Sequence, residues 1–304
     1  MKNHPIILVK TILHSILALV LGAVIFAFWL SPRLGGLIPW GKEAINPTIS
    51  VLHFDTLDHG APRLNYPDIS QEPHLVELRT AYALDTLMHP GHTDLENVLA
   101  VQHWVRSRWQ HDGEHAAGTT NAIDILRAAE QGERFRCVEY SMVTTACLAA
   151  LGYRVRGLGL MARDIGEVRS GGGHAANEVY LRDLRKWMFL DPQYDIITFH
   201  DSVPLNAVEL QRMLALGHDV DVVNPSRTIG DEEYLRWIGP YLYYIYVTID
   251  RQSITLWDRV VGNKKQLTLY PIGAEQPAYF QRMIRWNNTF YTHALRDLYP
   301  VIPD

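Results

Sequence analysis

The sequence predicts a mixed α+β fold built around one central helix and a short antiparallel sheet. Residues 137–151 are mostly small and apolar, and Gly152 follows them as a C-terminal stop, so they predict a helix. Residues 153–161, 174–181 and 187–192 have the alternating or aromatic-rich composition of strands. A glycine-rich loop and a short charged turn separate these strands, and neither has a helical pattern. We therefore expect neighbouring strands to pair antiparallel.

Helical patterns precede this block. Over residues 74–111, apolar side chains recur three and four positions apart. Thr93 stands three residues ahead of Glu96, which is the pattern of a capping box at a helix start. Residues 120–130 predict a further short helix.

The last third of the chain predicts a C-terminal α+β extension. A helix is expected over residues 205–216, and strands are expected over 241–249 and 265–272. Residues 278–295 are interpreted as a helix. The segment 241–249 is too short to span a bilayer.

The N-terminus predicts a membrane anchor. Residues Thr11–Leu30 form a run of 20 without a formally charged side chain, which is long enough to cross the hydrocarbon layer as a helix. Lys2 and Lys10 precede the run, so the short N-terminus is expected in the cytoplasm. A cleaved signal peptide is the alternative, but the run ends in Phe-Trp-Leu-Ser-Pro, a poor cleavage site. Either interpretation places the main domain in the periplasm or outside the cell.

Five parts are expected along the chain. In order they are a cytoplasmic N-terminus (1–10), a transmembrane anchor (11–30), a linker and lead-in (31–73), the α+β core (74–200) and the C-terminal extension (201–304). Charged residues make up 20% and hydrophobic residues 47% of the chain, which is typical of a globular protein. The net charge is −5 and no basic stripe stands out, so no nucleic-acid partner is expected.

The two cysteines, Cys137 and Cys147, are expected to remain free. Ten residues of helix separate them by about 15 Å, whereas a disulfide needs Cα atoms within about 7 Å. Cys147 lies in an apolar run and is expected in the core. Cys137 directly follows Arg-Phe-Arg at the start of the helix. A free thiol is a liability in an oxidising compartment, so this position suggests a use.

Three residues are candidates for a catalytic site. Cys137 opens a helix, where the unpaired backbone N–H groups and the helix dipole favour a thiolate, and Arg134 and Arg136 add positive charge. His174 begins the second strand after a glycine loop, and Asp191 ends the third strand. Antiparallel neighbours joined by a tight turn bring these two residues to one sheet edge.

This set of residue types suits nucleophilic catalysis. A histidine within hydrogen-bonding reach accepts the thiol proton, and a carboxylate behind the histidine fixes its tautomer. Cys137 would then attack an amide or ester carbonyl and form a thioester. Its own backbone N–H is a natural first oxyanion donor.

Two stretches resemble the core of the transglutaminase-like superfamily. They are "FRCVEYSMVTTACLAALGYRVRGLGL" and "GGGHAANEVYLRDLRKWMFLDPQYD", and the resemblance covers about residues 132–195. It implies a papain-like fold with Cys137 as nucleophile, His174 as base and Asp191 as the residue that orients the histidine. The family includes protein cross-linkers, peptidases, amidases and members that have lost catalysis.

The chain departs from the family pattern in one place and leaves another open. The commoner motif has an aromatic residue directly after His-Ala, where this chain has Ala176. Animal transglutaminases place an upstream tryptophan indole at the oxyanion. Trp104 and Trp109 are both candidates for that position, and no motif selects between them.

Other site types are less well supported. His103, His111 and His115 lack the carboxylate or further histidine that a metal site needs, and no acidic loop of the calcium-binding kind is present in the sequence. Glu178 and Tyr180 are interpreted as residues of the sheet surface or as supports of the site. No cofactor and no metal are expected.

The sequence therefore predicts a membrane-anchored cysteine acyl-transfer enzyme that acts on peptide or isopeptide amides, with protein or cell-wall peptide as substrate. A non-catalytic binding or scaffold protein that retains the fold is the alternative. A redox thiol sensor would need a resolving cysteine, and Cys147 is too far along the helix.

Overall fold

The computed structural model describes residues 49–57, 60–249 and 255–302. The expected anchor at 11–30, the N-terminus before it and the linker up to residue 48 lie outside the described residues. Within the described ranges, no helix has the length and apolar character needed to cross a membrane.

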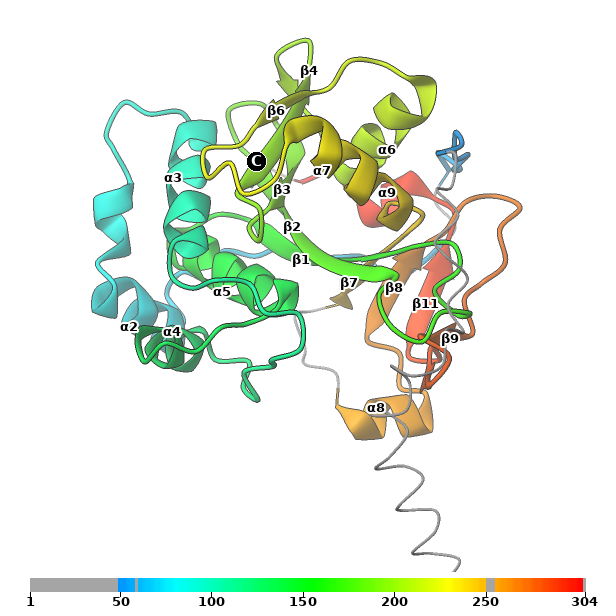
Figure 1. The fold of residues 1–304 in the computed structure, drawn as a ribbon, viewed down its shortest axis with the longest axis horizontal. Helices are drawn as coiled ribbons and strands as arrows, with labels where there is room; N and C mark the ends of the chain where they lie inside the picture. Colours follow the sequence, from blue (N-terminus) through cyan, green and yellow to red (C-terminus); the bar gives the residue numbers. More distant parts are fainter. Residues whose placement is uncertain (1–48, 58–59, 250–254, 303–304) are drawn as a thin grey trace, which may run out of the picture. The chain divides into compact units, whose positions relative to one another are not determined.

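A nine-stranded sheet forms the centre of the molecule (Figure 1). Its strand order is β11-β8-β7-β1-β2-β3-β4-β5, and β6 pairs with β4. The strands are β1 (Val155–Met161), β2 (Gly173–Leu181), β3 (Lys186–Asp191), β4 (Ile196–His200), β5 (Val203–Pro204), β6 (Asp221–Val223), β7 (Tyr244–Thr248), β8 (Gln266–Leu269) and β11 (Thr289–Thr292). Neighbours pair antiparallel except β8 and β11, which are parallel. The predicted β1–β2–β3 arrangement is confirmed, within a larger sheet than expected.

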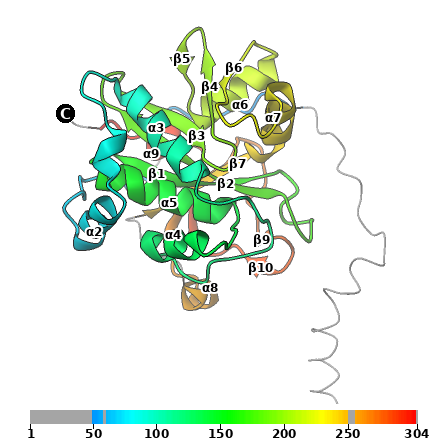
Figure 2. The same cartoon turned by 60° about the vertical axis from the view of Figure 1, so that its left-hand side comes forward.

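Helices pack on both faces of this sheet (Figure 2). One face carries α2 (Pro73–Ala81), the 3₁₀ helix η1 (Leu84–Leu87), α3 (Asp94–Arg106), α4 (Ala122–Glu130) and α5 (Cys137–Ala150). The other carries α6 (Ala207–Leu216), α7 (Asp231–Ile238), the 3₁₀ helix η2 (Gly239–Tyr241) and α9 (Leu295–Leu298). The short helix α8 (Leu256–Val261) lies apart from these layers. The alternation of strand side chains divides the core accordingly: Val179 packs with α2–α5 and Tyr180 packs on the opposite face.

The central helix α5 has the limits that its sequence predicts. Its first turn is closed by Glu139, whose side chain accepts from the backbone N–H of Arg136 at 3.2 Å. Its last residues are followed by Gly152, whose φ of +83° is the left-handed conformation that ends many helices. The helix is buried on most of its surface, which explains the apolar residues around its full circumference.

The interpretation of residues 278–295 as a helix is wrong. This segment forms the hairpin of β9 (Tyr279–Phe280) and β10 (Ile284–Arg285), followed by β11. Gln281 and Arg282 take φ values of +52° and +58°, so the chain reverses between β9 and β10. The segment is rich in aromatic and β-branched residues, which pack well on a sheet, and β11 completes the sheet beside β8.

Candidate active site

The fold brings the three predicted site residues together. Cys137 is the first residue of α5, His174 is the second residue of β2, and Asp191 is the last residue of β3. Gly173 precedes the histidine, and a Cβ there would lie 2.9 Å from the Phe280 ring, so the close packing at the start of β2 requires a glycine.

A continuous hydrogen-bonded chain links these side chains. The His174 ring bonds to Asp191 through Nε2, at 2.8 Å from Oδ2. The same ring forms a hydrogen bond with the Cys137 thiol, for which Nδ1 is the remaining ring nitrogen. The backbone N–H of Ala175 also hydrogen-bonds the sulfur. The order of groups is therefore thiol, imidazole, carboxylate.

This arrangement favours the charged form of both members of the Cys–His pair. Burial raises the pKa of the Cys137 thiol, but the hydrogen bond and positive charge of His174 and the Ala175 amide outweigh burial, so the pKa lies below its ordinary value. Burial lowers the pKa of His174, but the charge and hydrogen bond of Asp191 and the contact with Cys137 raise it to about 10. Together these contacts favour the thiolate and the imidazolium over the neutral pair.

Asp191 is held by three donors. Its side chain is fully buried. Besides the histidine, Oδ2 accepts from the Tyr234 hydroxyl at 3.1 Å, and Oδ1 accepts from the backbone N–H of Gln193 at 3.1 Å. Burial and the carboxylate charge raise the pKa of Tyr234 well above its ordinary value, so the phenol remains a donor. These bonds fix the carboxylate in one orientation.

The C-terminal extension supplies an aromatic wall beside the histidine. The Trp237 ring meets the His174 ring edge to face, with centroids 4.9 Å apart, and the Tyr241 ring lies 6.2 Å away. Tyr194 packs against Trp237 at 5.0 Å. Ala176, where the family commonly has an aromatic residue, is fully buried. Sequence reasoning missed this wall, although the density of aromatic residues over 234–246 was a visible signal.

The contribution expected from the two arginines needs correction. Arg136 forms an ion pair with Glu139 at 2.8 Å, and Glu139 is 2% exposed. The charge of Arg136 is therefore largely balanced, and Arg134 is exposed. His174 is the main source of thiolate stabilisation. Glu139 instead fixes the preceding loop, because it also accepts from the Ala117 N–H at 3.2 Å.

The two candidate tryptophans have different surroundings. Trp109 is buried, stacks on Tyr140 with centroids 4.3 Å apart and meets Phe135 edge to face. Its indole N–H has no hydrogen-bond partner among the described residues. Trp104 packs on Tyr82 and under Arg108. Trp109 is therefore the tryptophan that packs against residues on both sides of Cys137 in the chain.

His111 lies near enough to His174 to feel its charge, and no sequence motif indicates a role for it there. It pairs with Phe135 in an isolated bridge just ahead of α5. Burial, and then the positive charge of His174, lower the pKa of His111, so this imidazole is neutral at neutral pH. Across the described ranges, no group of three or more His, Cys, Asp or Glu side chains could hold a metal ion.

Among the remaining sequence predictions, those for the two cysteines are confirmed and one for Glu178 is wrong. Cys147 is fully buried and burial raises the pKa of its thiol, as its apolar run predicts. Both cysteines are free. The assignment of Glu178 to the sheet surface is wrong, because its side chain is fully buried and pairs with Arg156. An arginine on the neighbouring strand makes that burial possible.

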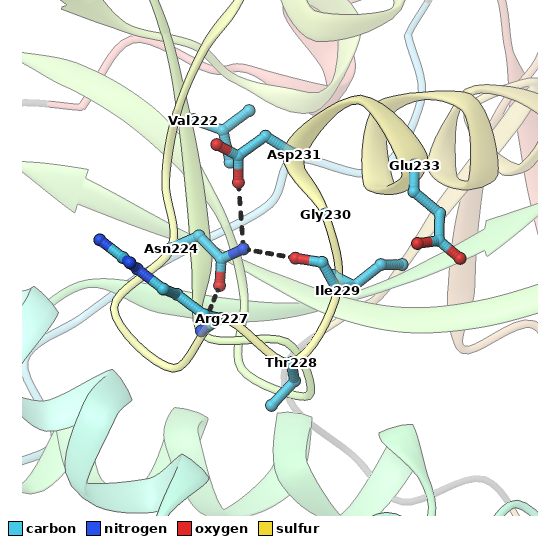
Figure 3. A pocket seen from close by; sticks show the side chains of 8 residues that line it. All are labelled: Val222, Asn224, Arg227, Thr228, Ile229, Gly230, Asp231 and Glu233. Carbon is cyan, nitrogen blue, oxygen red and sulfur yellow. Dashed lines mark hydrogen bonds between the residues drawn. The ribbon is translucent and has the colours of Figure 1, made fainter.

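A pocket of about 670 Å³ opens beside the start of α7 (Figure 3). Its lining residues are Val222, Asn224, Arg227, Thr228, Ile229, Gly230, Asp231 and Glu233. Asn224 organises the loop by donating to the Ile229 carbonyl at 2.8 Å and to Asp231 at 3.1 Å. The pocket contains neither the sulfur nor the histidine, so it is not the place where acyl chemistry would occur.

A family model and a solved structure are each similar to part of this chain. Residues 82–192 match the family model of the transglutaminase-like superfamily, and they include Cys137, His174 and Asp191. This part of the chain is similar to that superfamily. A solved structure from Cytophaga hutchinsonii, provisionally described as a cysteine protease, is 16% identical with a TM-score of 0.32. The match covers 59% of this chain and 62% of that one. No curated protein matches the chain.

Proposed function

We propose that this protein is a cysteine-nucleophile acyl-transfer enzyme that acts on peptide or isopeptide amides. The observation that carries the proposal is the hydrogen-bonded chain from the half-buried Cys137 thiol through the buried His174 ring to the buried Asp191 carboxylate. Cys137 is the nucleophile, His174 is the general acid and base, and Asp191 orients the ring. We further propose that residues 11–30 anchor the enzyme in a membrane, with the main domain on the periplasmic or extracellular side.

The reaction follows from the ion pair. The Cys137 thiolate attacks the carbonyl carbon and a C–S bond forms, while the negative charge moves to the carbonyl oxygen. The backbone N–H of Cys137, at the first position of α5, donates to that oxygen. The His174 imidazolium protonates the leaving nitrogen as the C–N bond breaks, and a thioester remains.

Release of the acyl group reverses the roles. Neutral His174 accepts a proton from water or from an amine as that nucleophile attacks the thioester, and the thiolate leaves. Water gives hydrolysis and an amine gives cross-linking. Peptide and protein substrates, including cell-wall peptide, have the amide and amine groups that these two outcomes require.

Thiol labelling tests the nucleophile. The full chain is treated with iodoacetamide at neutral pH and labelling is followed by mass spectrometry. Cys137 should react at least about tenfold faster than Cys147, because its pKa is lowered while the other thiol is buried and protonated. His174→Ala should slow the labelling of Cys137 and leave the labelling of Cys147 unchanged.

The same experiment distinguishes the alternative. Equal and slow labelling of the two cysteines in the native protein would support a scaffold that retains the fold without chemistry. Trapping an acyl adduct on Cys137 after exposure to peptide amides, and its absence in Cys137→Ser, would identify the substrate side chain.

A further inference from the structure

The short helix α8 presents an apolar face to solvent. Trp257, Val260 and Val261 are three and four residues apart, so they lie on one side of the helix. These side chains are 69%, 64% and 52% exposed. We refer to these three side chains as the α8 patch. A tryptophan and two valines side by side on a surface are unusual in a protein that remains in water.

The exposed face has a fixed orientation, because the other side of α8 is anchored. Asp258 is 4% exposed, and its carboxylate accepts from the backbone N–H and hydroxyl of Thr255 at the helix start. It also accepts from the Asn263 amide at 2.8 Å and pairs with Lys265 at 3.0 Å. The helix cannot roll over to bury the α8 patch without breaking these bonds.

The surroundings of the α8 patch are basic. Residues 255–265 contain three basic residues and one acidic residue, and residues 279–287 contain two basic residues and no acidic one. The acidic residue is Asp258, which is already paired. The two segments adjoin, because a Cβ at Gly262 would lie 3.4 Å from the Asn287 side chain. This local excess of positive charge contrasts with the net charge of −5 of the whole chain.

We propose that the α8 patch inserts into the interfacial layer of an anionic lipid bilayer. Tryptophan favours the boundary between headgroups and acyl chains, valines add apolar area, and the basic residues attract anionic headgroups.

The proposal goes beyond the cysteine chemistry and uses the proposed anchor. Only 18 residues separate Leu30 from Ile49, and a linker of that length reaches at most about 60 Å. The described chain begins beside α6, because the Ser50 carbonyl accepts from the Gln211 amide at 2.8 Å. The linker alone therefore does not fix the orientation of the domain, and in this proposal the α8 patch fixes which end faces the bilayer.

Fluorescence quenching from the lipid headgroup tests this orientation. The full chain carries Cys137→Ser and a single new cysteine, either Val260→Cys in the α8 patch or Leu216→Cys, for an environment-sensitive dye. Leu216 is a matched control: it is an apolar residue, 46% exposed, at the end of α6. Figures 1 and 2 both show α6 and α8 at opposite ends of the domain. The protein is reconstituted in vesicles of phosphatidylcholine and phosphatidylglycerol that contain a nitroxide-labelled headgroup.

We expect quenching at position 260 to exceed quenching at position 216 several-fold. The difference should shrink when phosphatidylglycerol is omitted or when salt is raised, because the basic rim contributes part of the attraction. Lys264→Glu should reduce quenching at position 260 about fivefold or more, whereas Arg212→Glu on α6 should leave it unchanged.

Three results would overturn the proposal. The first is equal quenching at the two positions, and the second is failure of the full chain to float with vesicles. The third is protection of the dye at position 260 in detergent without vesicles, which would identify a second copy or the N-terminal segment as the true cover. These readouts need no activity, so they are independent of the result for Cys137 chemistry.

Discussion

At Cys137 the reactive form of the thiol is stabilised by its partner rather than by the helix start alone. An unperturbed thiol is mostly protonated at neutral pH. Here burial opposes ionisation, and His174 and the Ala175 amide overcome it. The histidine is charged because Asp191 sits behind it, so the three groups act as a unit.

The unit predicts a bell-shaped rate profile. The rate of Cys137 labelling, or of turnover, should rise with pH as the thiolate forms, with an acid limb below the ordinary thiol pKa. Turnover should fall near pH 10, where the pKa of His174 places loss of the proton needed by the leaving group. The two limbs report the coupled pair. A profile with no acid limb below the ordinary thiol pKa would contradict a thiolate mechanism.

The charged histidine also predicts how stability depends on pH. Its pKa is about 6.5 in an unfolded chain and about 10 in the folded protein. Because the folded value is the higher one, its stabilising contribution is complete below about pH 6.5 and is lost as pH rises through 10. Urea unfolding at several pH values should show this loss, and His174→Gln should remove that part of the pH dependence.

Tyr234 is a positioning residue in this interpretation. Tyr234→Phe removes one donor from Asp191, so we expect labelling of Cys137 to slow several-fold and the free energy of unfolding to fall by about 1 kcal/mol. The matched control is Tyr244→Phe, which removes a buried hydroxyl that bonds the Glu275 carbonyl at 2.8 Å. The control should lose similar stability and keep the labelling rate. Equal rates in the two variants would leave Tyr234 without a positioning role.

At the scale of elements, the part of the fold predictable from sequence is the part specified by local signals. The start of α5, its glycine stop and the alternation along β2 and β3 are each signalled by a few neighbouring residues, and they correctly predicted the His174–Asp191 edge. The helix prediction for residues 278–295 is wrong because short strands and a tight hairpin carry little local signal. The pairing of β11 with β8 is decided by tertiary contacts. The aromatic wall of Trp237 and Tyr241 is likewise set by packing between distant segments.

The β1–β7 pairing depends on a glycine. Gly159 lies opposite Tyr246, and a Cβ at Gly159 would lie 1.8 Å from the Tyr246 ring. Gly159→Ala should therefore lower the free energy of unfolding by about 3 kcal/mol, measured by urea denaturation. Gly157→Ala on the same strand meets Ser141 Oγ at 3.2 Å and Thr145 Oγ1 at 3.9 Å, and should cost less. Adding Tyr246→Ala to Gly159→Ala should recover part of the loss; no recovery would show that the ring is not the obstacle.

At the scale of the whole domain, a buried charged cluster ties both ends of the described chain to the sheet. Arg156 on β1 bonds to Glu178 on β2, to the Tyr66 hydroxyl at 2.9 Å and to the Leu298 carbonyl. Glu178 in turn accepts from the Tyr299 hydroxyl at 2.8 Å. The lead-in and the C-terminal segment therefore both bond to one ion pair. The hydrogen bonds of this pair are complete only when both segments are in place.

This buried ion pair predicts that single and double variants differ strongly in their free energy of unfolding. Glu178→Gln leaves Arg156 buried without a counter-charge and should lower the free energy of unfolding by about 3–5 kcal/mol. Arg156→Met combined with Glu178→Leu removes both charges and should cost less than the single variant, because no unpaired charge remains. Tyr299→Phe should cost only about 1 kcal/mol, since it removes one hydrogen bond from a carboxylate that keeps its arginine. Urea unfolding measures all three. If the double variant is less stable than Glu178→Gln, the cluster stabilises the domain by direct attraction, and the desolvation argument for it is wrong.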